Sequence, residues 1–188
     1  TRTCTEAVEL GWRLHRLAFL DGRGGDRVVR PLLAALDRDG GRALPMTESL
    51  LSRISGKDNP QMVLGAFEQR WQDPGRIAPD AGRCWIALDR VRDPGNLGTI
   101  MRTADATGAR GIILIGDCTD PYSVEAVRAS MGAVFNVELA QMPEDDFLDL
   151  AAGWPGQIVG TALPASRDYR KVDYAGPLIL LMGNEQAG

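Results

Sequence analysis

Two continuous apolar runs, at 84–88 and 112–115, are the strongest feature of the hydrophobic pattern along the chain. Solidly apolar runs of this length are typical of strands that are buried on both faces. Between the runs, Asp93-Pro94-Gly95 has strong turn chemistry, and Gly108 supplies a helix stop. The residues between those signals have the i, i+3, i+4, i+7 spacing of a helix, with apolar positions at Leu97, Ile100, Met101 and Ala104. The stretch therefore predicts a strand, a loop, a helix and a second strand.

Two strands joined by a helix are expected to pair in parallel through a right-handed connection. Ligands of open parallel sheets bind at the carboxyl ends of the strands. Asn96 lies at the start of the predicted helix and Arg102 lies one to two turns further on. We therefore expect both side chains to face this edge.

Strand and helix patterns continue to alternate after this unit. We predict helices at 121–129, capped by Thr119 or Asp120, and at 143–152, and strands at 135–139, 157–161 and 177–182. The last run is continuously apolar, as a central parallel strand should be, and it leads into Gly183-Asn184-Glu185. A second polar cluster is therefore expected at the same edge.

The first third of the chain has its own alternation. We predict helices at 3–10, 26–37 (capped by Asp26) and 47–54, and strands at 16–20, 42–46 and 61–67. This pattern describes a small α/β domain, followed by Pro, Gly and polar residues that indicate a linker. We divide the chain into a first domain at 1–70, a linker at 71–82 and a parallel-sheet domain at 83–188.

Charge is uneven along the 188 residues. Residues 1–72 carry 11 Lys and Arg against 9 Asp and Glu, whereas 73–188 carry 10 against 16, for a total of −4. An acidic total argues against indiscriminate binding of nucleic acid, although it leaves room for a local basic patch in the first domain.

Cysteine and histidine usage excludes several kinds of site. Cys4, Cys84 and Cys118 are far apart and have no CxxC spacing, which argues against a disulfide framework and a zinc site. His15 is the single histidine, so a metal site with several histidines is excluded. No apolar run approaches the roughly 18 residues of a membrane span, and no signal peptide opens the chain. We expect a soluble, cytoplasmic protein without metal or membrane partners.

Three segments carry a resemblance to a known family. The run from Asn96 to Ala104, NLGTIMRTA, resembles the first motif of the SpoU branch of the SPOUT superfamily, the RNA ribose 2'-O-methyltransferases. Gly183-Asn184-Glu185 resembles the second motif, although Gln186 replaces the glycine that usually follows. The segment Ala129–Ala133 is similar to the short A-S-x-G-A stretch of these enzymes, and the first domain is similar to their ribosomal-protein-like substrate-binding domain.

The resemblance implies an α/β sheet whose C-terminal segment forms a trefoil knot, S-adenosylmethionine as cofactor, RNA as substrate and a homodimer formed through the methyltransferase domain. The third family motif and a last helix are expected after Gly188, and the chain opens abruptly in a helix. We therefore expect this sequence to be truncated at both ends.

The resemblance also assigns residues to roles. By position, Arg102 is the residue that contacts the ribose 2'-hydroxyl, but its guanidinium has a pKa above about 12 and is a poor base. We expect Arg102 to hold a phosphate or polarise the hydroxyl, with Asn96 orienting it and Glu185 fixing the network. The alternative is a structural Arg102–Glu185 pair that ties helix to strand.

The expected cofactor wall is made mainly of backbone. A glycine at a strand end lets the chain pass close to an adenosyl group. The residues assigned to this wall are Gly183, Asn184, Thr161, Ala162 and Leu163. Ser130 either contacts RNA or caps its own turn.

Two other functions remain open from the sequence. One is a noncatalytic RNA-binding protein on the same scaffold, and the other is an unrelated nucleotide-binding α/β enzyme. The chain has no GxGxxG after its first strand and no P-loop, which argues against the second. The choice between ribosomal and transfer RNA also stays open.

Overall fold

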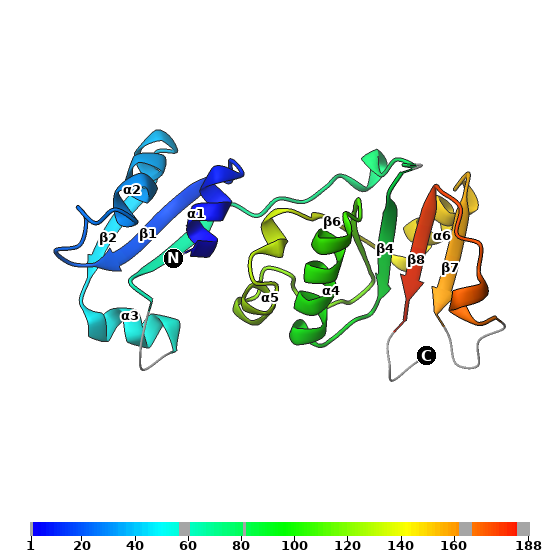
Figure 1. Ribbon diagram of the computed structural model, residues 1–188. Helices are drawn as coiled ribbons and strands as arrows, with labels where there is room; N and C mark the ends of the chain where they lie inside the picture. Colours follow the sequence, from blue (N-terminus) through cyan, green and yellow to red (C-terminus); the bar gives the residue numbers. More distant parts are fainter. Residues whose placement is uncertain (1, 57–60, 81, 162–166, 184–188) are drawn as a thin grey trace. The chain divides into compact units, whose positions relative to one another are not determined.

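The computed structural model describes residues 2–56, 61–80, 82–161 and 167–183 (Figure 1). The chain divides into two compact units, Thr1–Gln69 and Arg70–Gly188, each of which is described by itself.

The first unit is a three-stranded sheet with helices packed on it. Its elements are α1 (Arg2–Glu9), β1 (Leu14–Leu20), α2 (Val29–Arg38), β2 (Arg42–Met46), α3 (Glu48–Ser55) and β3 (Val63–Phe67). The strand order is β2-β1-β3, with β1 parallel to β2 and antiparallel to β3. Leu17 and Phe19 of β1 pack against Val29, Leu32 and Leu36 of α2. The alternate face of β1, which carries Arg16, is therefore turned away from α2.

The second unit is a five-stranded parallel sheet. Its elements are η1 (Pro74–Arg76), β4 (Cys84–Asp89), α4 (Pro94–Thr107), β5 (Gly111–Ile115), α5 (Val124–Ala129), η2 (Ala133–Phe135), β6 (Glu138–Met142), α6 (Glu144–Ala152), β7 (Gln157–Thr161), η3 (Tyr169–Lys171) and β8 (Leu178–Met182). The order is β6-β5-β4-β8-β7, and every neighbouring pair is parallel. The predicted fold class, a small α/β domain followed by a parallel-sheet domain, is confirmed.

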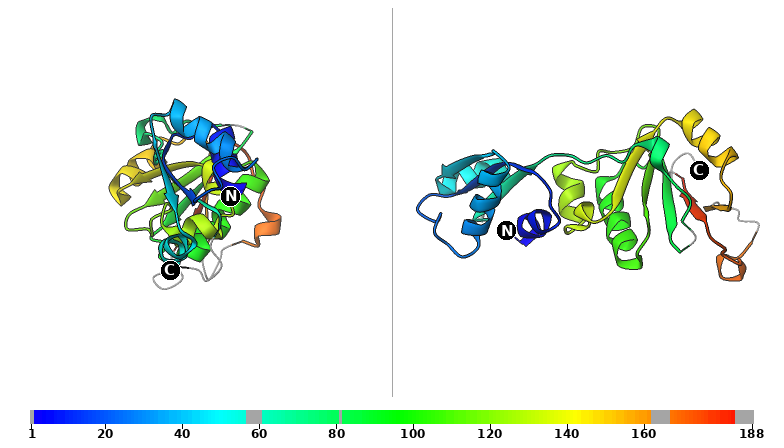
Figure 2. Two further views of the ribbon diagram at one scale, coloured as in Figure 1. Left: turned by 90° about the vertical axis from the view of Figure 1, so that its left-hand side faces the viewer. Right: turned by 90° about the horizontal axis from the view of Figure 1, so that it is seen from above.

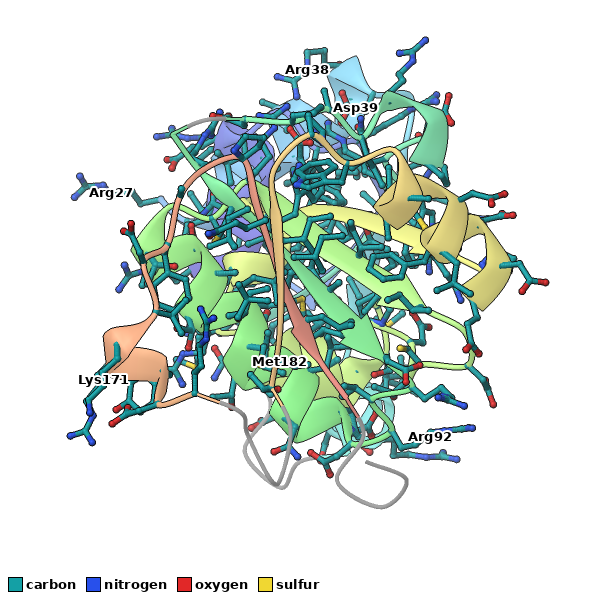
Figure 3. The ribbon with its side chains drawn as sticks, turned by 90° about the vertical axis from the view of Figure 1, so that its right-hand side faces the viewer. Arg27, Arg38, Asp39, Arg92, Lys171 and Met182 are labelled. Atoms are coloured by element: carbon teal, nitrogen blue, oxygen red, sulfur yellow. The ribbon has the colours of Figure 1, made fainter. Side chains whose placement is uncertain are left out.

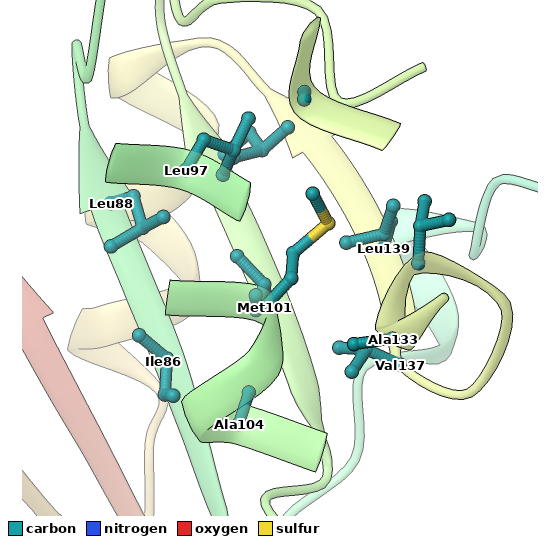
Figure 4. Packing of buried hydrophobic residues seen from close by; sticks show 12 residues of the cluster. Ile86, Leu88, Leu97, Met101, Ala104, Ala133, Val137 and Leu139 are labelled. Atoms are coloured by element: carbon teal, nitrogen blue, oxygen red, sulfur yellow. The ribbon is translucent and has the colours of Figure 1, made fainter. Parts of the chain in front are cut away.

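Helices cover both faces of this sheet (Figure 2). On one face, Leu97, Met101 and Ala104 of α4 pack with Ile86 and Leu88 of β4 (Figure 4). On the other face, Phe147 of α6 packs with residues of the central strands, Trp85, Ala87, Ile113 and Ile179. Because β4 and β5 are buried on both sides, their sequences are apolar except at Asp89, where β4 ends.

The stretch at 71–82, which we interpreted as a linker, is part of the second unit and makes specific contacts with the rest of it. The backbone N–H of Gln72 donates to the carbonyl of Leu139 at 2.8 Å. Ile77 is buried with 7% of its surface exposed, and Trp85 Nε1 donates to the carbonyl of Ala78 at 3.1 Å. Composition alone did not reveal this packing, because Gln72 and Ala78 form these hydrogen bonds with their backbone atoms.

The largest error in the predicted elements is the strand at 135–139. The chain forms the short turn η2 there, and β6 begins three residues later than predicted, at Glu138. Val134 and Val137 are used to fill the core beneath α4 instead of pairing in the sheet.

Two predicted helix caps are also wrong. Ser123, not Thr119 or Asp120, caps α5, accepting from the N–H of Ala126 at 3.2 Å. Asp26 does not cap α2, which begins at Val29 without a side-chain cap. No helix among the described residues is long and apolar enough to cross a membrane.

Candidate active site

The carboxyl ends of the five parallel strands form one edge of the second unit. In the sheet register, Leu88 of β4 lies opposite Met182 of β8, so the loop after β4 and the chain after β8 leave the sheet side by side. Figure 3 shows Met182 and Arg92, which follows β4, at this same end. The predicted meeting of two strand ends is therefore confirmed by the register.

The loop between β4 and α4 is fixed by its own polar side chains. Asp89 and Arg90 form a bidentate pair with two contacts of 2.8 Å, and this carboxylate raises the pKa of Arg90. Arg92 bonds to Asp117 in the loop after β5 at 2.5 Å. Arg90 has φ of 52°, a left-handed conformation that is uncommon for residues other than glycine. These contacts thus hold the loop in one conformation at the carboxyl ends of the strands.

Helix α4 begins at this edge with a side-chain cap. Asp93 Oδ1 accepts from the N–H of Asn96 at 2.6 Å, and Pro94 occupies a first-turn position that needs no amide donor. The side chain of Asn96 is exposed beside this cap. Sequence reasoning placed Asn96 correctly at the edge but did not identify Asp93 as the residue that fixes the helix start.

Packing between helices explains why the motif has a glycine at position 98. A Cβ at this position would lie 2.3 Å from the Cβ of Ala129 and 2.8 Å from the N of Ser130. Helix α4 and the end of α5 therefore touch where a side chain would not fit. The close approach sets the C-terminal end of α5 beside the first turns of α4.

Arg102 is exposed, and it has no ion pair or hydrogen bond within the described ranges. At about 100° per residue, Arg102 lies about 40° round the helix from Gly98, on the flank that faces α5. Asn96 lies about 120° from Arg102, on the flank toward β8. The two residues therefore start from different flanks of α4, and the role of Asn96 in orienting Arg102 stays a prediction.

The remaining predicted site residues differ in how much the structure says of them. Thr161 and Gly183 are exposed at the ends of neighbouring strands, and Thr161 Oγ1 donates to the carbonyl of Leu181 at 3.4 Å. The residues assigned from the sequence that lie outside the described residues are Ala162, Leu163, Asn184 and Glu185.

Ser130 does not present its hydroxyl to solvent. Its surface is 1% exposed, and its Oγ donates to the carbonyl of Val127 at 2.8 Å. The N–H of Gly132 donates to the same Oγ at 3.4 Å. Of the two interpretations offered by the sequence, the geometry favours the cap of a turn.

Within the described ranges, no group of His, Cys, Asp and Glu side chains is arranged to hold a metal ion. The exposed side chains of Asn96 and Arg102 carry hydrogen-bond donors that can bind and orient a substrate. The exposed guanidinium of Arg102, further along α4, is suited to an anionic or hydroxyl-bearing ligand.

Comparison with known proteins gives a consistent result. Residues 83–188 match the model of the SpoU rRNA Methylase family. The 23S rRNA (uridine(2479)-2'-O)-methyltransferase of Streptomyces viridochromogenes is 32% identical over 194 residues, which cover 100% of this chain and 67% of that protein. The chain spans 56% of the 23S rRNA (guanosine(2553)-2'-O)-methyltransferase of Bacillus subtilis, at 27% identity over 76% of this chain.

Solved structures agree with these relatives. The crystal structure of AdoMet-bound rRNA methyltransferase from Sinorhizobium meliloti has a TM-score of 0.93 and 46% identity, covering 100% of this chain and 70% of that one. The SpoU methyltransferase AviRb from Streptomyces viridochromogenes in complex with AdoMet has a TM-score of 0.83 and 32% identity, covering 100% of this chain and 72% of that one.

Proposed function

The chain belongs to the SpoU rRNA methylase family, and from this premise we propose that the complete protein methylates a ribose 2'-hydroxyl of ribosomal RNA with S-adenosylmethionine. The observation that carries the proposal is Arg102, an exposed arginine without a described partner on the helix that starts at the carboxyl edge of the sheet. Family membership removes the unrelated nucleotide-binding enzyme as an alternative and leaves the noncatalytic RNA-binding protein to be tested.

The described strand ends fit the cofactor. Gly160 and Gly183, near the ends of β7 and β8, have open space where a Cβ would lie, so the backbone there is accessible to a flat adenosyl group. Thr161 and Gly183 would hold the group, together with the assigned residues Ala162, Leu163 and Asn184. When bound, S-adenosylmethionine supplies an electrophilic methyl group on sulfur.

The protein's part in the reaction is positioning. Held at these strand ends, S-adenosylmethionine would supply its methyl group to the ribose oxygen by in-line displacement, and the hydroxyl proton would pass to water. Such an in-line displacement depends on holding the two reacting atoms close and aligned. We assign Arg102 to the substrate, where its fork of donors holds the phosphate or polarises the hydroxyl. Asn96, on the flank toward β8, and Glu185, after that strand, are assigned to the polar network of the strand ends.

The first unit supplies a surface for the RNA. Arg16 of β1 lies in register with Arg42 of the neighbouring parallel strand β2, about 4.8 Å away across the sheet. Both are exposed, and neither has an acidic partner within the described ranges. Like charges set side by side destabilise a sheet unless an anion lies between them. We propose that this arginine pair binds RNA phosphate.

A homodimer formed through the methyltransferase domain completes the proposal. Within one chain, Arg102 faces α5, whereas Gly183 follows β8 on the other side of β4. A second copy whose strand ends meet the Arg102 flank would bring the reacting groups together. The mass of the complete protein in solution tests this, and a monomer with full activity would contradict it. We place the reaction in the cytoplasm, in accord with the free thiols of Cys4, Cys84 and Cys118.

The central experiment uses the complete protein, S-adenosylmethionine with a tritiated methyl group and ribosomal RNA. We expect tritium in the RNA and, after alkaline hydrolysis, in dinucleotides, because a 2'-O-methyl group blocks cleavage of the neighbouring phosphodiester. Binding of the RNA without incorporation would identify the noncatalytic alternative. Incorporation into mononucleotides would place the methyl group on a base and would also reject the proposal.

A further inference from the structure

Two residues other than glycine have positive φ angles among the described residues, and both flank the start of α4. Arg90 has φ of 52° in the loop before the helix, and Met131 has φ of 54° in the turn after α5. Strained backbone conformations of this kind persist only where the surrounding structure enforces them. They are concentrated at functional sites. Arg90 is accounted for by its bidentate bond to Asp89. No comparable side-chain bond explains the positive φ angle of Met131.

The turn around Met131 is held by its neighbours. Ser130 on one side is 1% exposed, and its Oγ bonds to the carbonyl of Val127 and to the N–H of Gly132. Gly132 on the other side is buried, with φ of 105°. The N–H of Met131 itself donates to the carbonyl of Arg128 at 3.2 Å. The left-handed conformation is therefore built into the turn and does not depend on the methionine.

The side chain of Met131 is not buried by the fold. It is 71% exposed, whereas the strained conformation would suit glycine or asparagine better than a long apolar residue. A single exposed apolar residue is ordinary, but one that is also strained is not. Neither packing nor backbone preference explains a methionine at this position.

Position links Met131 to Arg102. The N of Ser130, the preceding residue, lies 2.8 Å from where a Cβ of Gly98 would be. Arg102 follows Gly98 by one helical turn on the same flank, and helical side chains lean toward the helix start, in this case toward the Ser130 turn. An apolar group and a guanidinium without a described partner therefore lie toward the same flank of α4.

We propose that Met131 is a substrate-positioning residue that packs against the base of the target nucleotide, or of its direct neighbour, while Arg102 engages the phosphate or ribose. A nucleotide offers this combination in one ligand, an apolar ring face beside an anionic backbone. Thioether side chains make favourable contacts with aromatic rings and adapt to their shape. The left-handed turn aims the side chain outward, which accounts for retaining the strain. The inference rests on the proposed methyl transfer to RNA.

The test compares three variants of the complete protein by methyl transfer to ribosomal RNA and by thermal midpoint. Met131→Gly removes the side chain and relieves the backbone, and Met131→Gln keeps the length but loses the apolar character. Leu148→Gln is the matched control, because Leu148 is 55% exposed on α6, which covers the other face of the sheet.

We expect Met131→Gly to raise the KM for RNA about tenfold with little change in kcat, as for a contact present in both ground and transition states. Its thermal midpoint should stay equal or rise, a combination that loss of a structural residue would not give. Met131→Gln should raise KM in the same direction, and Leu148→Gln should not.

Other outcomes would overturn the inference or its premise. A wild-type KM in Met131→Gly and in Met131→Gln would remove Met131 from the RNA contact. A fall in activity that follows dissociation of the protein into monomers would assign Met131 to a contact between two copies of this chain and reject the base contact. Absence of methyl transfer by the unaltered protein would instead reject the proposed function itself.

Discussion

Gly98 and Ala129 meet where α4 and α5 touch, and a Cβ on the glycine would lie 2.3 Å from the Cβ of the alanine. This contact fixes the flank of α4 that carries Arg102 against the turn that carries Met131. The motif glycine is thus a packing residue that sets the end of α5 beside α4.

Gly98→Ala should destabilise the protein by about 1–3 kcal/mol, because the added methyl overpacks the contact between the helices. Helix propensity alone predicts the opposite sign, a gain of about 1 kcal/mol for replacing glycine inside a helix. Urea denaturation measures the difference. Gly160→Ala is the control, because nothing lies within 4 Å of a Cβ there. A stabilised Gly98→Ala variant would show that α4 and α5 are free to separate.

Arg102→Lys should lower methyl transfer by about 100-fold or more, equivalent to roughly 3 kcal/mol of transition-state stabilisation. Lysine keeps the charge but loses the planar fork that directs two donors at one group. The thermal midpoint and the affinity for S-adenosylmethionine should stay close to those of the unaltered protein, because Arg102 is exposed and has no described partner.

Both measurements should be made on one preparation of the complete protein. If the arginine were a structural tie to Glu185, the midpoint would fall and the folded fraction would keep its turnover. Near-normal transfer at near-normal stability would eliminate Arg102 as the residue that activates the substrate.

Replacing Arg16 and Arg42 together by alanine should weaken RNA binding and flatten its salt dependence. Each lost phosphate contact should reduce the slope of log affinity against log salt concentration by about 0.9 on a duplex, or about 0.7 on a single strand. The matched control changes Arg27 and Arg30 to alanine. Both are exposed without described partners, Arg27 just before α2 and Arg30 in its first turn, and α2 packs on the opposite face of the sheet. Equal slopes for the two double variants would remove the arginine pair from the RNA surface.

Tyr122 should make stability depend on pH in the alkaline range. Its hydroxyl bonds to the carbonyl of Arg70 and accepts from the Arg70 N–H at 3.3 Å, and burial raises the pKa of Tyr122 from 10.0 to about 12. The folded state therefore holds the phenol proton more tightly than the unfolded state does. The resulting stability is complete below pH 10 and is lost as the pH rises toward about 12.

Denaturation at a series of pH values through this window measures the effect. The fall in the free energy of unfolding should be shallower in Tyr122→Phe, which has no phenol proton to lose. A second variant, Trp71→Ala, removes the ring that packs edge-on against Tyr122 with centroids 5.2 Å apart, and should lower the apparent pKa by exposing the phenol. An unchanged alkaline slope in Tyr122→Phe would assign the loss to other groups.

The sequence by itself determined the order of elements, the parallel sheet and the edge at which the site lies. Runs such as 84–88 and 178–182 are apolar at every position because strands covered on both faces must be, and this requirement is visible without coordinates. The first motif likewise placed Asn96 and Arg102 on a helix that starts at the strand ends. The family prediction is confirmed by the matching model and relatives, whereas the roles of the individual site residues stay predictions.

Only the tertiary structure decided how those residues are turned and what surrounds them. It set the Gly98 flank of α4 against the end of α5, buried the hydroxyl of Ser130 and left Met131 exposed in a strained turn. It also moved β6 three residues along the chain, because Val134 was needed in the core beneath α4. Sequence patterns report local periodicity and burial, but these outcomes depend on contacts such as that of Gly98 with Ala129, which join segments that no local pattern connects.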